Sequence, residues 1–237
     1  MEKYNTSEIP KSSRITRLVD HLYAKMPEIE SYRAKLITES YKETEDQPII
    51  TRRAKAFSHI LHNIPIIIRD EELIVGSNSI APRGCQTFPE FSFQWLEDEL
   101  DTVATRTADP FYISEQAKAD LREVHKYWKG KTTSELATAY MAPEAIRAID
   151  HNIFTPNYFY NGVGHVTVKY WEVLEIGYEG IMAKAQAELD KCNVGDGDYA
   201  ERSRFLEAVI MSCQAVIDYA DRYAKLTLEM AEQCTDS

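Results

Sequence analysis

The feature that most constrains the fold is a long helical pattern near the end of the sequence. From Tyr199 to Gln233 there is no proline or glycine, and apolar side chains recur at helical spacing. A helix of about 35 residues depends on tertiary packing more than on its own helix propensity. We therefore expect this helix to pack along its length or to continue a larger structure. Its predicted buried side consists of Phe205, Val209, Ile210, Cys213, Val216, Ile217 and Tyr223.

Helical patterns also dominate the rest of the chain. Ser12 and Ser114 carry the short hydroxyl side chain that favours an N-cap, and Thr132 with Glu135 matches a capping box. We predict helices that begin at Ser12–Ser13, Ile29, Pro48, Phe91, Ser114, Thr132, Pro143 and Tyr170. In the helix that follows Pro48, the residues expected to face the core are Ile49, Ala54, Phe57, Ile60 and Leu61.

One segment has a different pattern. Between residues 64 and 76, two short runs rich in β-branched residues flank the acidic residues Asp70–Glu72. This pattern predicts a small two-stranded ribbon, or one strand beside an extended edge. Residues 77–90 and 151–169 are predicted loops, because turn-forming residues interrupt both. The predicted fold class is therefore mostly α, with little strand.

The formal net charge of −11 at pH 7 restricts the partners. It argues against nucleic acid, because phosphate backbones bind basic surfaces, and against anionic membrane surfaces. No apolar run approaches the roughly 20 residues that span a bilayer, and residues 1–5 lack the pattern of a signal peptide. We expect a cytoplasmic protein without a membrane partner. The four cysteines are widely spaced, so we expect free thiols.

The segment Asn161–Gly162–Val163–Gly164–His165 is the most suggestive candidate site. Glycines let the backbone approach a ligand closely, and a histidine can donate or accept a hydrogen bond at neutral pH. On spacing alone, a tight turn with a structural histidine is the simpler interpretation.

Two further patterns carry weaker signals. His59 and His62 lie three residues apart on a predicted helix, but no carboxylate or third histidine nearby in the sequence supports a metal site. The acidic runs Asp70–Glu72 and Glu97–Glu99 are interpreted as solvated faces. Taken one by one, these motifs indicate a helix-rich domain of unknown activity, and no metal ligand is assigned.

An ordered series of segments says more than any single motif. It consists of Ile49–Ala56, Ile60–Ile66, Ile68–Gly76, Pro89–Phe91, Trp95–Asp101, Ile113–Glu115, Tyr127–Trp128, Gly164–Val166, Val173–Gly177 and Gly180–Ile181. The series resembles the amino-terminal part of the pyruvate formate-lyase-like domain of glycyl radical enzymes, over nearly the whole chain. Within that family, Tyr160–Val166 is most similar to the coenzyme-B12-independent glycerol and propane-1,2-diol dehydratases.

The resemblance implies a fold, a substrate and a cofactor requirement. Residues 1–237 would be the amino-terminal part of the domain, as the helical layer that flanks a ten-stranded α/β barrel. The substrate would be a small polyol, and His165 would contact one of its hydroxyls. The chain itself would bind no cofactor. The full-length enzyme would need a glycyl radical, installed by an S-adenosylmethionine radical activating enzyme, and a homodimer is a candidate assembly.

The family mechanism also uses groups that this sequence lacks. It needs a glycine near the carboxyl terminus and a mid-chain cysteine that is closely followed by a glutamate. Cys85 follows Gly84 but precedes Gln86, and no other cysteine has such a setting. No catalytic residue is therefore assigned, and His165 is the one predicted substrate-binding residue. We expect an incomplete part of a carbon–oxygen lyase that is inactive by itself.

Two alternatives remain open at this point. The chain could belong to a sibling glycyl radical enzyme, such as choline trimethylamine-lyase, isethionate lyase or formate acetyltransferase. It could also be a non-catalytic, truncated helical module.

Overall fold

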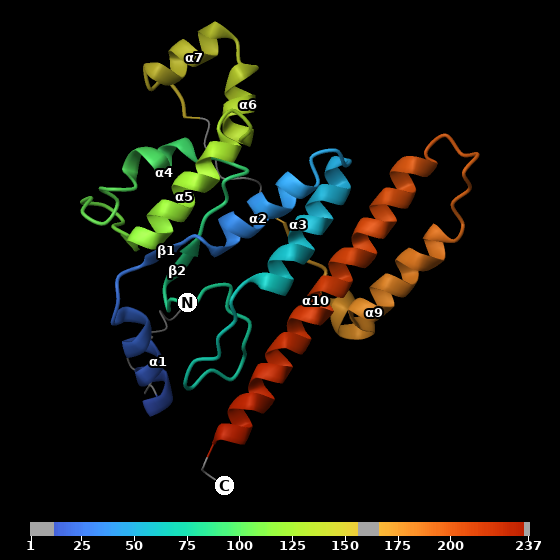
Figure 1. Cartoon of the computed structure of the whole chain (residues 1–237), viewed down its shortest axis with the longest axis horizontal. Coiled ribbons are helices and arrows are strands. Elements are labelled where there is room, and N and C mark those ends of the chain that lie inside the picture. The colour runs from blue at the N-terminus through green and yellow to red at the C-terminus, as the bar shows by residue number, and fades with distance from the viewer. Residues whose placement is uncertain (1–11, 156–165, 235–237) are drawn as a thin grey trace, which may run out of the picture.

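The computed structural model describes residues 12–155 and 166–234, and it is predominantly helical (Figure 1). This confirms the mostly α prediction. No helix in these ranges is both long and apolar enough to span a bilayer. The helices are α1 Ser13–Tyr23, α2 Tyr32–Glu43, α3 Ile49–Asn63, α4 Gln94–Glu99, α5 Glu115–Trp128, α6 Thr133–Ala139, α7 Pro143–Asp150, α9 Tyr170–Leu189 and α10 Tyr199–Gln233.

A small parallel sheet joins three segments that are far apart in the sequence. Its strands are β1 Glu28–Glu30, β2 Gly84–Gln86 and β3 Tyr112–Ile113, in the order β2-β1-β3. Ile29 of β1 is in register with Cys85 on one side and with Ile113 on the other. Within the described ranges these are the only strands, so the barrel of the implied fold is not covered by them.

The strands predicted between residues 64 and 76 are wrong. This segment has no regular secondary structure, and the side chains of Leu73 and Ile74 are 79% and 92% exposed. A β-branched run becomes a strand only where it finds an edge with which to pair. Here β2 and β3 occupy both edges of β1, so no edge of that strand is left for residues 64–76.

Three predicted boundaries also need correction. The helix expected from Ile29 begins only at Tyr32, because residues 28–30 pair as β1. The helix expected from Phe91 begins at Gln94, and residues 84–86 of the predicted loop form β2. At β1 and β2, pairing between distant segments overrides the local pattern. Before α4, the carbonyls of Glu90 and Phe91 accept from the backbone N–H groups of Thr133 and Ser134.

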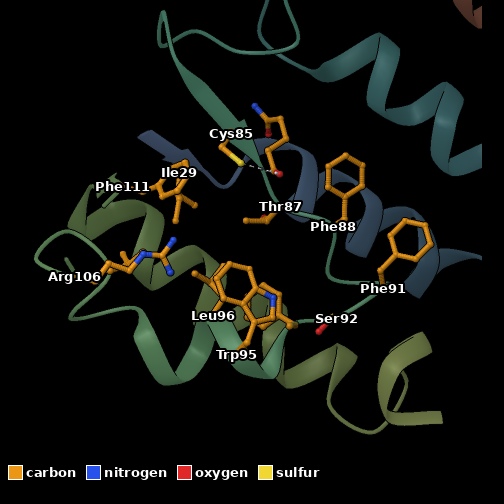
Figure 2. Close-up of a pocket in the computed structure, with 13 residues that line it drawn as sticks. Ile29, Cys85, Thr87, Phe88, Phe91, Ser92, Trp95, Leu96, Arg106 and Phe111 are labelled. Atoms are coloured by element: carbon orange, nitrogen blue, oxygen red, sulfur yellow. Dashed lines mark hydrogen bonds between the residues drawn. The ribbon is translucent and has the colours of Figure 1, made fainter. Parts of the chain in front are cut away.

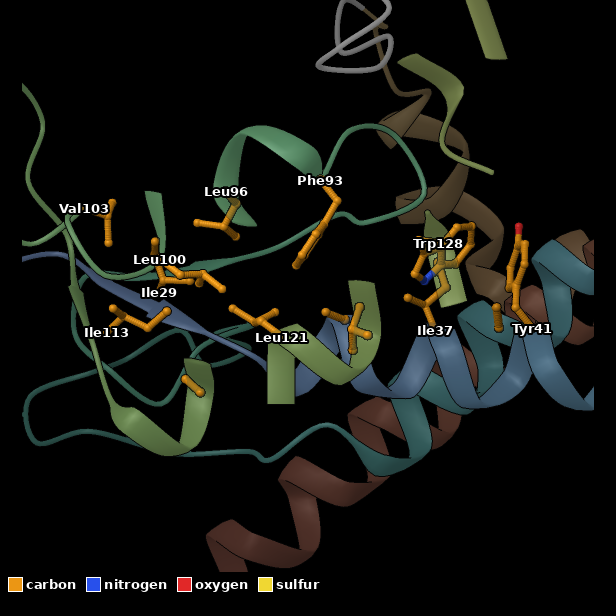
Figure 3. Packing of buried hydrophobic residues seen from close by; sticks show 14 residues of the cluster. Ile29, Ile37, Tyr41, Phe93, Leu96, Leu100, Val103, Ile113, Leu121 and Trp128 are labelled. Atoms are coloured by element: carbon orange, nitrogen blue, oxygen red, sulfur yellow. The ribbon is translucent and has the colours of Figure 1, made fainter. Parts of the chain in front are cut away.

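The main apolar core lies among the sheet, α2, α4 and α5 (Figure 3). Leu121 of α5 is fully buried at its centre. At one end, the rings of Tyr41 and Trp128 lie 5.1 Å apart, and Trp128 Nε1 donates a 2.8 Å hydrogen bond to Thr38 Oγ1. The buried indole therefore has its polar atom satisfied, as burial of tryptophan requires.

The long helix α10 packs against both α3 and α9, which confirms the expectation that it packs along its length (Figure 1). Arg222 on α10 donates a 2.8 Å hydrogen bond to the carbonyl of Ile64, and Tyr219 and Tyr223 donate to the carbonyl of Ser77. The helix thus holds the end of α3 and the irregular segment that follows it.

The predicted inward faces are only partly correct. Cys213 and Tyr223 are buried, but Phe205, Ile49 and Phe57 are exposed. The buried residues of α3 are Ala54 and Ala56, and Ile60 is partly buried against the core. Periodicity located the helices, but it did not select which of the apolar residues meets a neighbour.

The capping box of α6 is present, and we expect Thr132→Ala to destabilise the fold by about 1–2 kcal/mol. Thr132 Oγ1 accepts from the backbone N–H of Glu135 at 3.2 Å, and its side chain is almost fully buried. Urea unfolding measures the loss. Thr107→Ala, at an exposed threonine, is the control and should change stability by less than about 0.5 kcal/mol. Equal effects of the two substitutions would contradict the capping role.

Candidate functional site

The site predicted from the sequence, Asn161–His165, lies outside the described residues, which stop at Thr155 and resume at Val166. Before it, α7 begins with Pro143 in its first turn. After it comes α9, which is bent at Gly177, where φ is 65° and ψ is 178°. Glycine adopts this conformation without the strain that a side chain would add. The substrate-binding role of His165 stays a prediction.

The described flanks of this segment expose several large apolar side chains. On the α7 side, Ile153 and Phe154 are exposed, and on the α9 side Tyr170 and Trp171 are exposed. Single exposed apolar residues are ordinary, whereas groups of them are typical of surfaces that contact a ligand or another polypeptide. Each flank therefore presents two adjacent large apolar side chains to solvent.

A buried carboxylate organises the segment that leads into β2. Glu30 is only 5% exposed, and its Oε1 accepts from the backbone N–H groups of Ile80 and Ala81 at 3.0 and 2.8 Å. Its Oε2 accepts from the side-chain amide of Gln86. Gly84 packs closely here, since a Cβ at that position would lie 1.5 Å from Ser79 Oγ. Sequence reasoning missed this cluster, because it joins residues about fifty positions apart.

The acidic runs are solvated faces only in part, since Asp70 and Asp98 are exposed but their glutamate neighbours interact with basic side chains. Glu72 pairs with Arg69 at 3.1 Å, and Arg69 also donates to the carbonyls of Ser79, Ile80 and Ala81. Glu71 pairs with arginines of α1. Residues 69–81 are thereby fixed by hydrogen bonds and ion pairs, although they lack regular secondary structure.

Two residues of the second acidic run also lie close to basic side chains. Glu99 pairs with Arg106 at 2.7 Å. Glu97 Oε2 is buried without a hydrogen-bond partner among the described residues, and it lies 3.6 Å from His125 Nδ1. Glu97 is therefore at most partly solvated.

The histidine pair of α3 does find carboxylates, which the sequence did not indicate. His59 Nε2 lies 3.2 Å from Glu39 of α2, and His62 Nε2 lies 2.9 Å from Asp218 of α10. The two histidines face different helices. In the described part of the chain, no group of three or more potential metal ligands comes together. The pair links helices instead.

All four cysteines lie in the described part of the chain and are free thiols, as predicted. Cys213 is buried in α10, and Cys85 lies on β2 beside a pocket (Figure 2). Burial, and to a lesser degree the charge of Glu30, raises the pKa of the Cys85 thiol. A thiol that stays protonated is a weak nucleophile.

A family profile described as pyruvate formate lyase-like matches residues 5–237. The chain belongs to the pyruvate formate lyase-like family. One relative in curated sequences is a (2S)-3-sulfopropanediol dehydratase of Klebsiella oxytoca, which is 33% identical over 226 residues. The alignment covers 93% of this chain and 27% of that protein.

Two solved structures are more similar still. One structure, reported for 1,2-propanediol dehydration in Roseburia inulinivorans, shares 65% sequence identity with this chain and has a TM-score of 0.93. The glycerol-bound B12-independent glycerol dehydratase of Clostridium butyricum is 51% identical, with a TM-score of 0.92. Each alignment covers 96% of this chain and 29% of the other. The likeness to glycyl radical enzymes of the diol dehydratase type, over a partial amino-terminal span, is confirmed.

Proposed function

We propose that this chain is the amino-terminal part of a glycyl radical diol dehydratase, a lyase that eliminates water from propane-1,2-diol or glycerol. The observation that carries the proposal is 65% identity to the propanediol structure over 96% of the chain. Identity to the glycerol dehydratase is lower, at 51%. Of the two diols, we therefore propose propane-1,2-diol as the substrate. The chain spans less than a third of these enzymes, so the activity would be that of a longer protein.

In this proposal the chain supplies a substrate contact and part of the scaffold. His165 would bond to one hydroxyl of the diol, where a neutral imidazole can orient the substrate and share its proton. The cysteine, the glutamate and the radical glycine would come from outside these residues. The helical layer would flank the barrel, and an S-adenosylmethionine activating enzyme would install the radical. The homodimer stays a prediction.

A chimeric enzyme tests the proposal. This chain would replace the matching amino-terminal 29% of the Roseburia inulinivorans enzyme. After anaerobic activation, we expect the chimera to convert propane-1,2-diol to propionaldehyde and water at a rate within about tenfold of the parent's, because the replaced segment has the same backbone path. The 237-residue chain alone, treated in the same way, should release no aldehyde.

The radical itself provides the control. Electron paramagnetic resonance shows whether the chimera carries a glycyl radical, independently of turnover. A chimera that carries the radical in the parent's yield but releases no aldehyde from propane-1,2-diol would overturn the proposed function. Aldehyde release by the isolated chain would contradict the proposal that the cysteine, the glutamate and the radical glycine come from outside these residues.

A further inference from the structure

The helix α9 consists of two pieces, 170–176 and 178–189, which meet at the bend at Gly177. A straight helix would place Glu172 and Lys184 about 18 Å apart along its axis, which is farther than the two side chains can bridge. Lys184 Nζ nevertheless donates a 2.7 Å hydrogen bond to Glu172 Oε1. The first piece therefore folds back toward the second.

One carboxylate joins the two pieces. Besides Lys184, Glu172 pairs with Lys169, whose Nζ lies 2.6 Å from Glu172 Oε2 just before the helix begins. Hydrogen bonds from Lys169 and Lys184 lower the pKa of Glu172 to about 2, so this carboxylate is charged at neutral pH. Neither lysine makes another ion pair in the described part of the chain. We call these three residues the Glu172 clamp.

Two glycines shape the bend. Gly177 has a φ of 65°, which glycine adopts without strain. A Cβ at Gly180 would lie 2.7 Å from the Cβ of Ile176, so the side chain of Ile176 lies directly on the backbone of Gly180. The bend is thus closely packed as well as clamped.

The first piece has little else in the described part of the chain to hold it. No residue from 166 to 176 is buried, and Tyr170, Trp171 and Leu174 are 67%, 62% and 86% exposed. Helices in proteins are stabilised mainly by the packing of an apolar face. Because this piece lacks such packing here, the charged clamp sets its position.

The clamp also lies close in sequence to the predicted substrate contact. His165 precedes Lys169 by four residues, and each peptide unit spans at most about 3.8 Å between Cα atoms. A residue tethered so closely can contact a substrate only where the clamp allows it to lie.

On the basis of the proposed function, we propose that Glu172 is a positioning residue for diol binding, because it clamps the chain that carries His165. Without the clamp, this chain would occupy the binding-competent arrangement for a smaller fraction of the time. The apparent affinity for the diol falls in proportion to that fraction. At saturation the bound diol itself selects the competent arrangement, so kcat is retained.

Glu172→Gln in the chimeric enzyme tests the inference, since it keeps the size of the side chain and removes its charge. We expect KM for propane-1,2-diol to rise about three- to tenfold and kcat to change by less than about twofold, at unchanged glycyl radical content. The matched control is Glu175→Gln. Glu175 is an exposed residue of the same piece, without an ion pair among the described residues, so this variant should leave KM and kcat unchanged.

Lys184→Met provides the second arm, because it keeps the apolar stem of the side chain and removes its charge. By itself it should raise KM, but in the Glu172→Gln background it should add little, since both substitutions break one interaction. Amide hydrogen exchange in the 237-residue chain gives a readout without substrate. Each substitution should speed exchange in residues 170–176 about threefold relative to residues 178–189.

An active chimera in which Glu172→Gln leaves KM unchanged would overturn this inference and leave the proposed function intact. Multiplicative effects of the two substitutions on KM, or a fall in radical content or in kcat alone, would also overturn it, because these results indicate a general loss of structure. Unchanged hydrogen exchange in residues 170–176 would show that no clamp exists. An unsubstituted chimera without diol turnover would overturn the proposed function, and this inference with it.

Discussion

His165→Ala in the chimeric enzyme is expected to lower the turnover of propane-1,2-diol by about 10²-fold or more. The reason is the loss of a group that orients the reacting hydroxyl and shares its proton, a contribution typically worth that much. The initial rate of aldehyde formation, measured over a range of diol concentrations, separates a change in kcat from one in KM. A substrate contact should affect both.

The matched control is His151→Ala, because His151 is exposed at the end of α7 on the described flank of the same segment. This variant should retain the rate of the unsubstituted chimera. The glycyl radical content should be equal in the unsubstituted chimera and in both histidine variants. Equal content would show that the activating enzyme still installs the radical. If His165→Ala keeps the full rate at normal radical content, His165 does not contribute to catalysis by contacting the substrate.

Glu30→Leu is expected to cost about 3 kcal/mol or more of the free energy of unfolding. The substitution removes the acceptor of two part-buried backbone N–H groups, and it leaves the buried Gln86 amide with only its bond to the carbonyl of Asn78. Urea unfolding, followed by circular dichroism, measures the change. Glu30→Gln keeps one carbonyl oxygen for the backbone N–H groups, so it should cost less.

Glu28→Leu is the control for this prediction, because Glu28 lies two residues earlier on the same strand and its carboxylate makes no hydrogen bond within the described part of the chain. It should change the stability by less than about 1 kcal/mol. A Glu30→Leu protein as stable as the control would mean that water replaces the carboxylate, and that the segment before β2 is held by other contacts.

Local signals predicted local structure well. Ser12, Ser114 and Thr132 all cap helices as expected, because a cap involves only the residue and the next turn. The sheet was missed for the opposite reason. Its strands are two or three residues long and pair across more than fifty residues, so a segment such as Glu28–Glu30 carries no periodic signal of its own.

The candidate sites also differ in whether the local sequence could indicate them. His165 was singled out by the resemblance of its neighbours to a family, not by spacing, and its surroundings lie outside the described residues. The cluster around Glu30 could not be predicted, since β1, β2 and the segment before β2 each supply only part of it. A site built by packing of distant elements becomes visible only when the fold is known.

The attachment of α10 has a consequence for how the protein is made. Tyr219 and Tyr223 bond to Ser77 across 142 and 146 residues, and Arg222 reaches Leu61 and Ile64 across 161 and 158. During synthesis the amino-terminal end emerges first, at roughly 5–20 residues per second. The segment after α3 therefore waits on the order of ten seconds for the helix that fastens it. Over that interval the side of α3 that packs on α10 stays uncovered, open to chaperones and to other nascent chains.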